Sequence, residues 1–91
     1  MSEVNAVDVK KGQVVRSIAG HDSNDIFAVV GSDEKNVFIC DGRERKVEKP
    51  KRKNRKHIEI LTYVLEPEEM AANGRLKKSL GKIKPELNKI I

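Results

Sequence analysis

Short apolar runs bounded by tight-turn residues recur between positions 12 and 64, and this pattern constrains the fold more than any other feature. The runs occupy residues 13–18, 26–30, 36–40 and 58–64. Val, Ile and Phe are frequent in them, as is typical of β-strands. No helical pattern of about 10–15 residues separates successive runs, so parallel βαβ units are not expected. The pattern predicts a mainly β fold, in which about five short strands form a small closed or nearly closed barrel.

Glycine and short polar residues mark the predicted turns. Gly12 and Gly20 bound the first run, and residues 19–25 read Ala-Gly-His-Asp-Ser-Asn-Asp. These residue types tolerate positive φ or hydrogen-bond to their own backbone, so the segment is predicted to be a turn. The pair Asp41-Gly42 predicts a two-residue hairpin of type I′, in which both residues have positive φ. We expect the chain to return from it as a charged edge strand over residues 43–48.

The last third of the chain is predicted to be a short helical tail. Pro and acidic residues at 66–69 are typical of a first helical turn, and Asn73-Gly74 is typical of a helix end. An amphipathic stripe at 4-3-4-3 spacing follows and consists of Leu76, Leu80, Ile83, Leu87 and Ile90. Pro85 is expected to divide the stripe into two short helices or to kink it. The stripe can dock on the barrel, bind a partner or form a homodimer, and these alternatives stay open.

The positive charge is concentrated in one segment. Residues 43–57 hold nine Lys/Arg and two Asp/Glu, a net charge of +7, whereas the whole chain carries +5. Such a run is stable as a solvated loop or against a polyanion. A membrane surface is disfavoured because neither an amphipathic helix nor a lipid anchor flanks the run. The composition therefore favours nucleic acid as the partner.

Several other classes of function are not expected. One Cys among 91 residues excludes a disulfide framework and a zinc site made of several thiolates, and Cys40 is expected to be buried. His21, Asp22 and Asp25 are interpreted as turn residues rather than as a catalytic or metal site. We expect no enzyme activity, no metal and no cofactor. The N-terminus has no signal-peptide pattern and no run approaches a membrane span, which predicts a soluble, cytoplasmic protein.

The residues from Gly12-Gln13-Val14-Val15 through Gly20 to Val30 resemble the KOW motif of ribosomal and transcription-associated proteins. Residues 36–64 are similar to the archaeal and eukaryotic large-subunit ribosomal protein numbered fourteen. Residues 11–64 as a whole are similar to short bacterial KOW-domain RNA-binding proteins. The resemblance implies an SH3-like barrel that binds RNA on or near a ribosome.

The residues that the resemblance carries over are the turn and the basic stretch. The turn positions are Gly12, Gly20, His21 and Asn24. In the family the turn commonly reads Gly, a basic residue, Asp, then a basic residue with another Gly. Here Asn24 stands where a Gly would take the left-handed conformation, and the added Asp25 makes the turn acidic. We therefore expect the basic stretch, rather than this turn, to contact phosphates.

The sequence thus predicts a flexible leader over residues 1–10, a barrel over 11–64 that includes a basic loop at 43–57, and a helical tail over 65–91. The predicted RNA contacts are Arg43, Arg45, Lys46, Lys49, Lys51, Arg52, Lys53, Asn54, Arg55, Lys56 and His57. For Asn54 a turn-forming role is the alternative, and for His57 a place as a spacer before the next strand.

The expected function is phosphate-directed binding of structured RNA, with ribosomal RNA and the large ribosomal subunit as the expected partners. The alternative is a protein-interaction barrel that docks an acidic partner. Base stacking is expected to be slight, because the chain has three aromatic residues. Two of them, Phe27 and Phe38, lie in apolar runs and are expected in the core. This leaves no aromatic cage for a methylated lysine.

Overall fold

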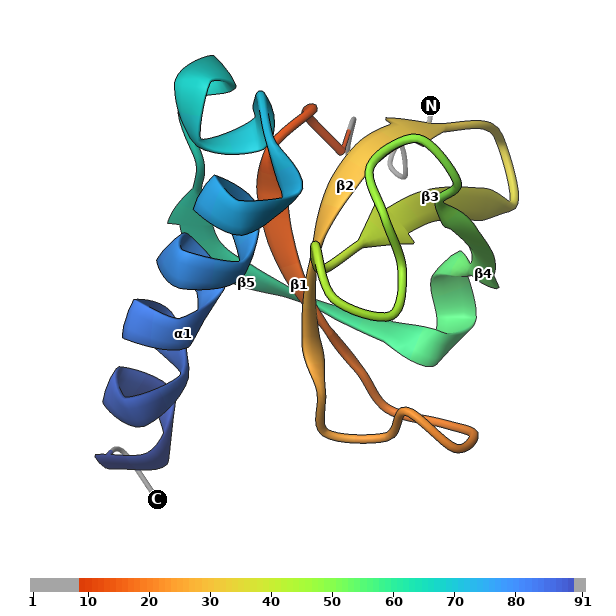
Figure 1. Cartoon of the computed structure of the whole chain (residues 1–91). Helices are drawn as coiled ribbons and strands as arrows, with labels where there is room; N and C mark the ends of the chain where they lie inside the picture. Colours follow the sequence, from red (N-terminus) through yellow and green to blue (C-terminus); the bar gives the residue numbers. More distant parts are fainter. Residues whose placement is uncertain (1–8, 90–91) are drawn as a thin grey trace.

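The computed structural model describes the backbone of residues 9–89 and the side chains of residues 9–86. Most of the predicted leader, the side chain of Leu87 and all of Ile90 lie outside the described residues. The elements are β1 (Gln13–Ser17), β2 (Ile26–Ser32), β3 (Asn36–Cys40), β4 (Lys51–Asn54), the 3-10 helix η1 (Arg55–His57), β5 (Ile58–Val64), the 3-10 helix η2 (Pro67–Met70) and α1 (Asn73–Lys89) (Figure 1).

The five strands form one antiparallel sheet in the order β4-β3-β2-β1-β5. Its two edge strands, β4 and β5, follow each other in the chain and are joined by the single turn η1. The sheet must therefore curl until its edges approach each other, and Figure 1 shows this curvature. The predicted mainly β, barrel-like fold with a helical C-terminal tail is confirmed.

Apolar side chains pack on both faces of the central strands. One cluster fills the concave interior and contains Val9, Val15, Phe27, Val29, Val37 and Ile39. The other covers the outer face and contains Val14, Ile26, Ala28, Cys40, Leu65, Met70, Leu76, Leu80 and Ile83. Because alternate residues of a strand point to opposite faces, β2 has to be apolar at nearly every position. This explains why residues 26–30 form a continuous apolar run.

The amphipathic stripe docks α1 on the outer face of the sheet. Leu76, Leu80 and Ile83 are buried there, which places the described part of the stripe inside the molecule. The helix continues through Pro85, so the predicted division into two short helices is wrong. A proline inside a helix removes one backbone hydrogen bond, and its ring crowds the carbonyl four residues earlier, here that of Gly81.

The predicted helix end at Asn73-Gly74 is also wrong, because α1 begins at Asn73. The Asn73 side chain accepts a hydrogen bond from the Val47 backbone N–H at 2.8 Å and donates one to Glu48 at 2.8 Å. These contacts with a distant loop hold Asn73 at the start of the helix. Only the single 3-10 turn η2 forms in the acidic segment before it.

The segment 43–48 is not the predicted edge strand, and the hairpin at Asp41-Gly42 is not type I′. Gly42 has a φ of +80°, whereas Asp41 is not among the described residues with positive φ. The Asp41 carboxylate accepts the backbone N–H groups of Arg43 and Arg45 at 2.9 and 3.0 Å, which bends the chain away from a strand. Residues 41–50 form a loop along the outer side of the sheet (Figure 1).

Phe27, Phe38 and Cys40 are all predicted to be buried, and the structure confirms this for Phe27 and Cys40. Phe27 is buried in the interior cluster, but Phe38 is half-buried and belongs to neither cluster. Cys40 is fully buried beneath α1. Burial, together with the nearby carboxylates of Asp41 and Glu48, raises the pKa of the Cys40 thiol to about 11.

Two glycines with similar φ provide a matched test of this packing. A Cβ at Gly42 would clash with the carbonyl oxygen of Asn73, whereas a Cβ at Gly20 would lie 3.5 Å from Lys53 Nζ, an ordinary van der Waals contact. Gly20→Ala is expected to cost about 1–2 kcal/mol, the penalty for a left-handed backbone. Gly42→Ala is expected to cost more, since the loop or the helix must also move. Urea unfolding measures both, and equal destabilisation would contradict the close packing of loop and helix.

Candidate nucleic-acid interface

The basic run is partly a strand, and the strand divides its cations between two faces. Residues 51–54 form β4, so the prediction that the whole of 43–57 is a loop is wrong. In the register with β3, Lys51 pairs with Ile39 and Lys53 pairs with Val37. Cross-strand partners lie on the same face, so both lysines point to the concave interior. Arg52 points to the other face.

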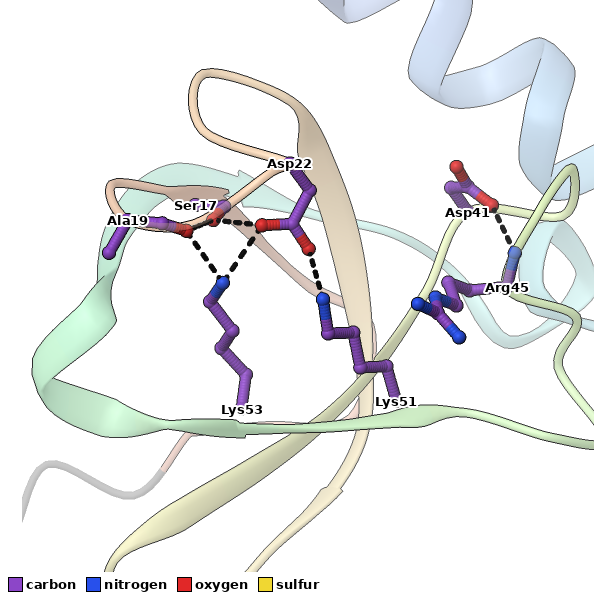
Figure 2. A network of polar contacts seen from close by, with 7 residues as sticks. All are labelled: Ser17, Ala19, Asp22, Asp41, Arg45, Lys51 and Lys53. Carbon is purple, nitrogen blue, oxygen red and sulfur yellow. Dashed lines mark hydrogen bonds and ion pairs between the residues drawn. The ribbon is translucent and has the colours of Figure 1, made fainter.

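Asp22 binds both of these lysines. Lys51 Nζ lies 2.8 Å from Asp22 Oδ2, and Lys53 Nζ lies 2.8 Å from Asp22 Oδ1 (Figure 2). Ser17 Oγ donates to the same carboxylate at 2.8 Å, and Lys53 also donates to the carbonyl oxygen of Ala19 at 2.8 Å. The side chain of Lys53 is 9% exposed, so it is not available to a ligand. We call Asp22, Lys51 and Lys53 the internal clamp.

The internal clamp changes the electrostatics of the predicted site. Burial alone raises the pKa of the Asp22 carboxyl, but the hydrogen bonds from the two lysines and Ser17 outweigh it and hold the pKa well below its usual range. Asp22 is therefore ionised at neutral pH. It offsets one of the two lysine charges and fastens the β1–β2 turn to β4. Two of the predicted RNA contacts, Lys51 and Lys53, are structural in this arrangement.

The turn itself has the backbone that the sequence predicts. Gly12, Gly20 and Asn24 have φ values of +93°, +86° and +75°. The backbone N–H of Asn24 donates to the Ser17 carbonyl at 2.7 Å, which closes the turn. His21 is exposed at the tip of the turn. The positive φ at Asn24 confirms that it takes the left-handed conformation.

Most of the other predicted contacts lie at the surface. The exposed members are Arg43, Arg45, Lys46, Lys49, Arg52, Asn54, Lys56 and His57. Asn54 Oδ1 accepts the backbone N–H of Lys56 at 2.8 Å and so caps η1, the turn-forming alternative. Arg55 is half-buried, and its Nε donates to the Asp33 carbonyl at 3.0 Å.

The basic face of α1 was not predicted from the sequence. Its exposed cations are Arg75, Lys77, Lys78, Lys82 and Lys84. Residues 58–91 together carry a net charge of only +1, because they contain six Lys/Arg and five Asp/Glu. The acidic turn before the helix hides the charge of the helix in that average.

Other kinds of site find little support in the described part of the chain. No group of three or more His, Cys, Asp and Glu side chains there is arranged to hold a metal ion. No helix among residues 9–89 combines the length and the apolar character needed to cross a bilayer. Comparison with protein-family models and with curated proteins finds no match to this chain.

The internal clamp makes a testable contribution to stability. Asp22→Asn leaves the buried Lys53 without an ionic partner and is expected to destabilise the protein at pH 7 by roughly 3 kcal/mol. Because the folded-state pKa of Asp22 is lowered, its contribution is complete above the unfolded value of about 3.8 and disappears as pH falls towards the folded value. Urea unfolding of both proteins between pH 7 and pH 2 should show the difference shrinking below about pH 4. A difference that stays constant throughout would argue against an ionised Asp22.

Proposed function

We propose that the protein binds structured RNA and acts in association with the ribosome. The observation that carries this proposal is the set of exposed cations in the β3–β4 loop, β4 and η1. Arg43, Arg45, Lys49, Arg52 and Lys56 have side chains with no hydrogen bond or ion pair to any other described residue. An array of unpaired cations close in sequence attracts a polyanion, since binding releases condensed counterions.

The chemistry of these side chains favours phosphates of a folded RNA. A-form helices hide their major groove from side chains, so proteins contact phosphates and 2′-hydroxyls instead. Arg can donate two parallel hydrogen bonds to one phosphate. The two phenylalanines give little support to base stacking, because Phe27 is buried and Phe38 is half-buried. Association with the ribosome rests on the resemblance of residues 11–64 to KOW-domain proteins.

The salt dependence of binding tests the RNA contact. We expect the triple variant Arg43→Ala, Arg45→Ala, Arg52→Ala to bind a fluorescently labelled RNA hairpin more weakly. The slope of log K against log salt should become shallower by about 0.7–0.9 for each phosphate that the variant no longer binds. Fluorescence anisotropy at several KCl concentrations measures this slope.

The matched control removes the same charge elsewhere. Lys10, Lys11 and Lys35 are exposed and lie outside the basic run. The variant with Ala at these three positions should retain most of the parent's slope. An equal decrease in the two triple variants would contradict a defined site and indicate only a general attraction between charges.

Sedimentation tests the association with the ribosome. The full chain should co-sediment with purified large ribosomal subunits at low salt and should be released by high salt or by ribonuclease. If the protein stays at the top of a sucrose gradient at both salt concentrations, the ribosomal part of the proposal is wrong. Release by salt but not by ribonuclease would instead favour an acidic protein partner.

A further inference from the structure

Helix α1 carries as much net positive charge as the whole chain. Residues 73–89 contain six Lys/Arg and one Glu, a net charge of +5, which equals the formal net charge of all 91 residues. Leu76, Leu80 and Ile83 face the sheet and are buried. Among the described side chains of the helix, Arg75, Lys77, Lys78, Lys82 and Lys84 are exposed. Lys77 and Lys84 lie on the flank towards the β3–β4 loop, and Arg75, Lys78 and Lys82 lie on the flank towards η2.

Most of the exposed cations of α1 have no hydrogen-bonding or ion-pair partner among the described residues. Arg75, Lys77, Lys78 and Lys82 make no hydrogen bond or ion pair with another described residue, and Lys84 lies 3.8 Å from Asp25 in an exposed pair. Glu68 and Glu69 line a shallow hollow together with Arg75, Lys78 and Lys82. Glu69 already accepts hydrogen bonds from Ser79 Oγ at 2.7 Å and from the Glu66 backbone N–H at 2.8 Å. Exposed ion pairs contribute little to stability, so the Lys84–Asp25 pair adds little to the free energy of folding.

The helix face is joined to the β3–β4 loop. Asn73 is hydrogen-bonded to Val47 and Glu48, and Gly42 is packed against the Asn73 carbonyl. Between loop and helix lies a cleft of about 270 Å³, and the apolar side chains of Ile26 and Leu80 line it. Arg43 from the loop and Lys77 and Lys84 from the helix also line it, as do Asp25, Asp41 and Glu44. Cations of the loop and of the helix therefore border one surface.

We propose that the exposed face of α1 is a second phosphate-binding surface, which holds a further stretch of the backbone of the RNA that the β3–β4 loop contacts. This inference rests on the proposed function and extends its site to a helix outside the KOW-like region. From Arg75 to Lys84 the cations span about 13 Å of helix axis. An RNA bound to loop and helix together makes more phosphate contacts than the loop alone provides.

The surface chemistry favours a nucleic-acid backbone over an acidic protein. Protein partners dock through buried apolar or aromatic anchors. The large apolar side chains that the structure exposes are Ile18, Ile60 and Val64, and none of them belongs to α1. At the outer crest of the helix, Gly81 and Pro85 offer no such anchor either. Lysines on a face without apolar anchors suit phosphates.

The test is the triple variant Lys77→Ala, Lys78→Ala, Lys82→Ala in the full chain. Alanine is the best helix former, and the three side chains are exposed, so the helix should keep its stability. Circular dichroism and urea unfolding check this. The probe is the same fluorescent RNA hairpin, in a long form and in a form shortened to half its stem. Binding of the long form should weaken, and its salt slope should become shallower by about 0.7–0.9 per phosphate released from the helix.

The outcomes separate this inference from the proposed function. A helix variant that binds the long hairpin with the parent's slope, while the loop triple variant is weakened, overturns the helix surface and leaves the function standing. The same weakening in the control with Ala at positions 10, 11 and 35 also overturns it. A parent that binds no RNA overturns both. Parent binding to polyglutamate as tight as to the hairpin overturns the assignment to RNA.

A difference between the two hairpins supports the inference. The parent should prefer the long hairpin, and the helix variant should bind both forms alike, since only the long form reaches from loop to helix. Combining the loop and helix variants should lower the slope by about the sum of the two separate decreases.

Discussion

The outer face of the central strands is apolar and has to be kept from water, and much of the remaining structure depends on how this is achieved. Val14, Ala28 and Cys40 on this face are fully buried because α1 lies over them with Leu76 and Leu80. Burying apolar surface is the main favourable contribution to folding in a domain this small. The same packing orients the charged side of the helix outwards and brings the β3–β4 loop into contact with the first turn of α1.

The fold could be predicted where one residue type determines one conformation. The strands at 26–30 and 36–40 follow from apolar runs between turns, and the positive φ at Gly20 and Asn24 follows from residue type. Two of the failures have a long-range contact as their cause. Strand β4 has no apolar signal, because its inward side chains are lysines paired with Asp22, about 30 residues earlier. Asn73 begins a helix because the distant loop holds it there.

The sequence predicts which segment carries the cations of the candidate site. It does not predict which of these cations point into the protein and which point to solvent. A count of charge over residues 43–57 finds the basic run, but it cannot tell which cations point inwards. That division requires the strand register, which pairs Lys53 with Val37 and Arg52 with Phe38. An acidic residue of the turn, Asp22, proves to be the partner of two of the cations. The basic face of α1 is missed by a charge count over residues 58–91, because the acidic residues in and around η2 cancel most of the positive charge of the helix.

The burial of Cys40 makes this thiol an internal indicator of whether the helix is seated. It is the single cysteine of the chain, it lies beneath α1, and its raised pKa keeps it protonated at neutral pH. A thiol in that state reacts slowly with alkylating reagents, which attack the thiolate. Its rate of labelling is then set by how often the helix lifts from the sheet, rather than by the intrinsic chemistry of sulfur. The native chain thus contains its own probe for local opening at the junction of sheet and helix, without any engineered label.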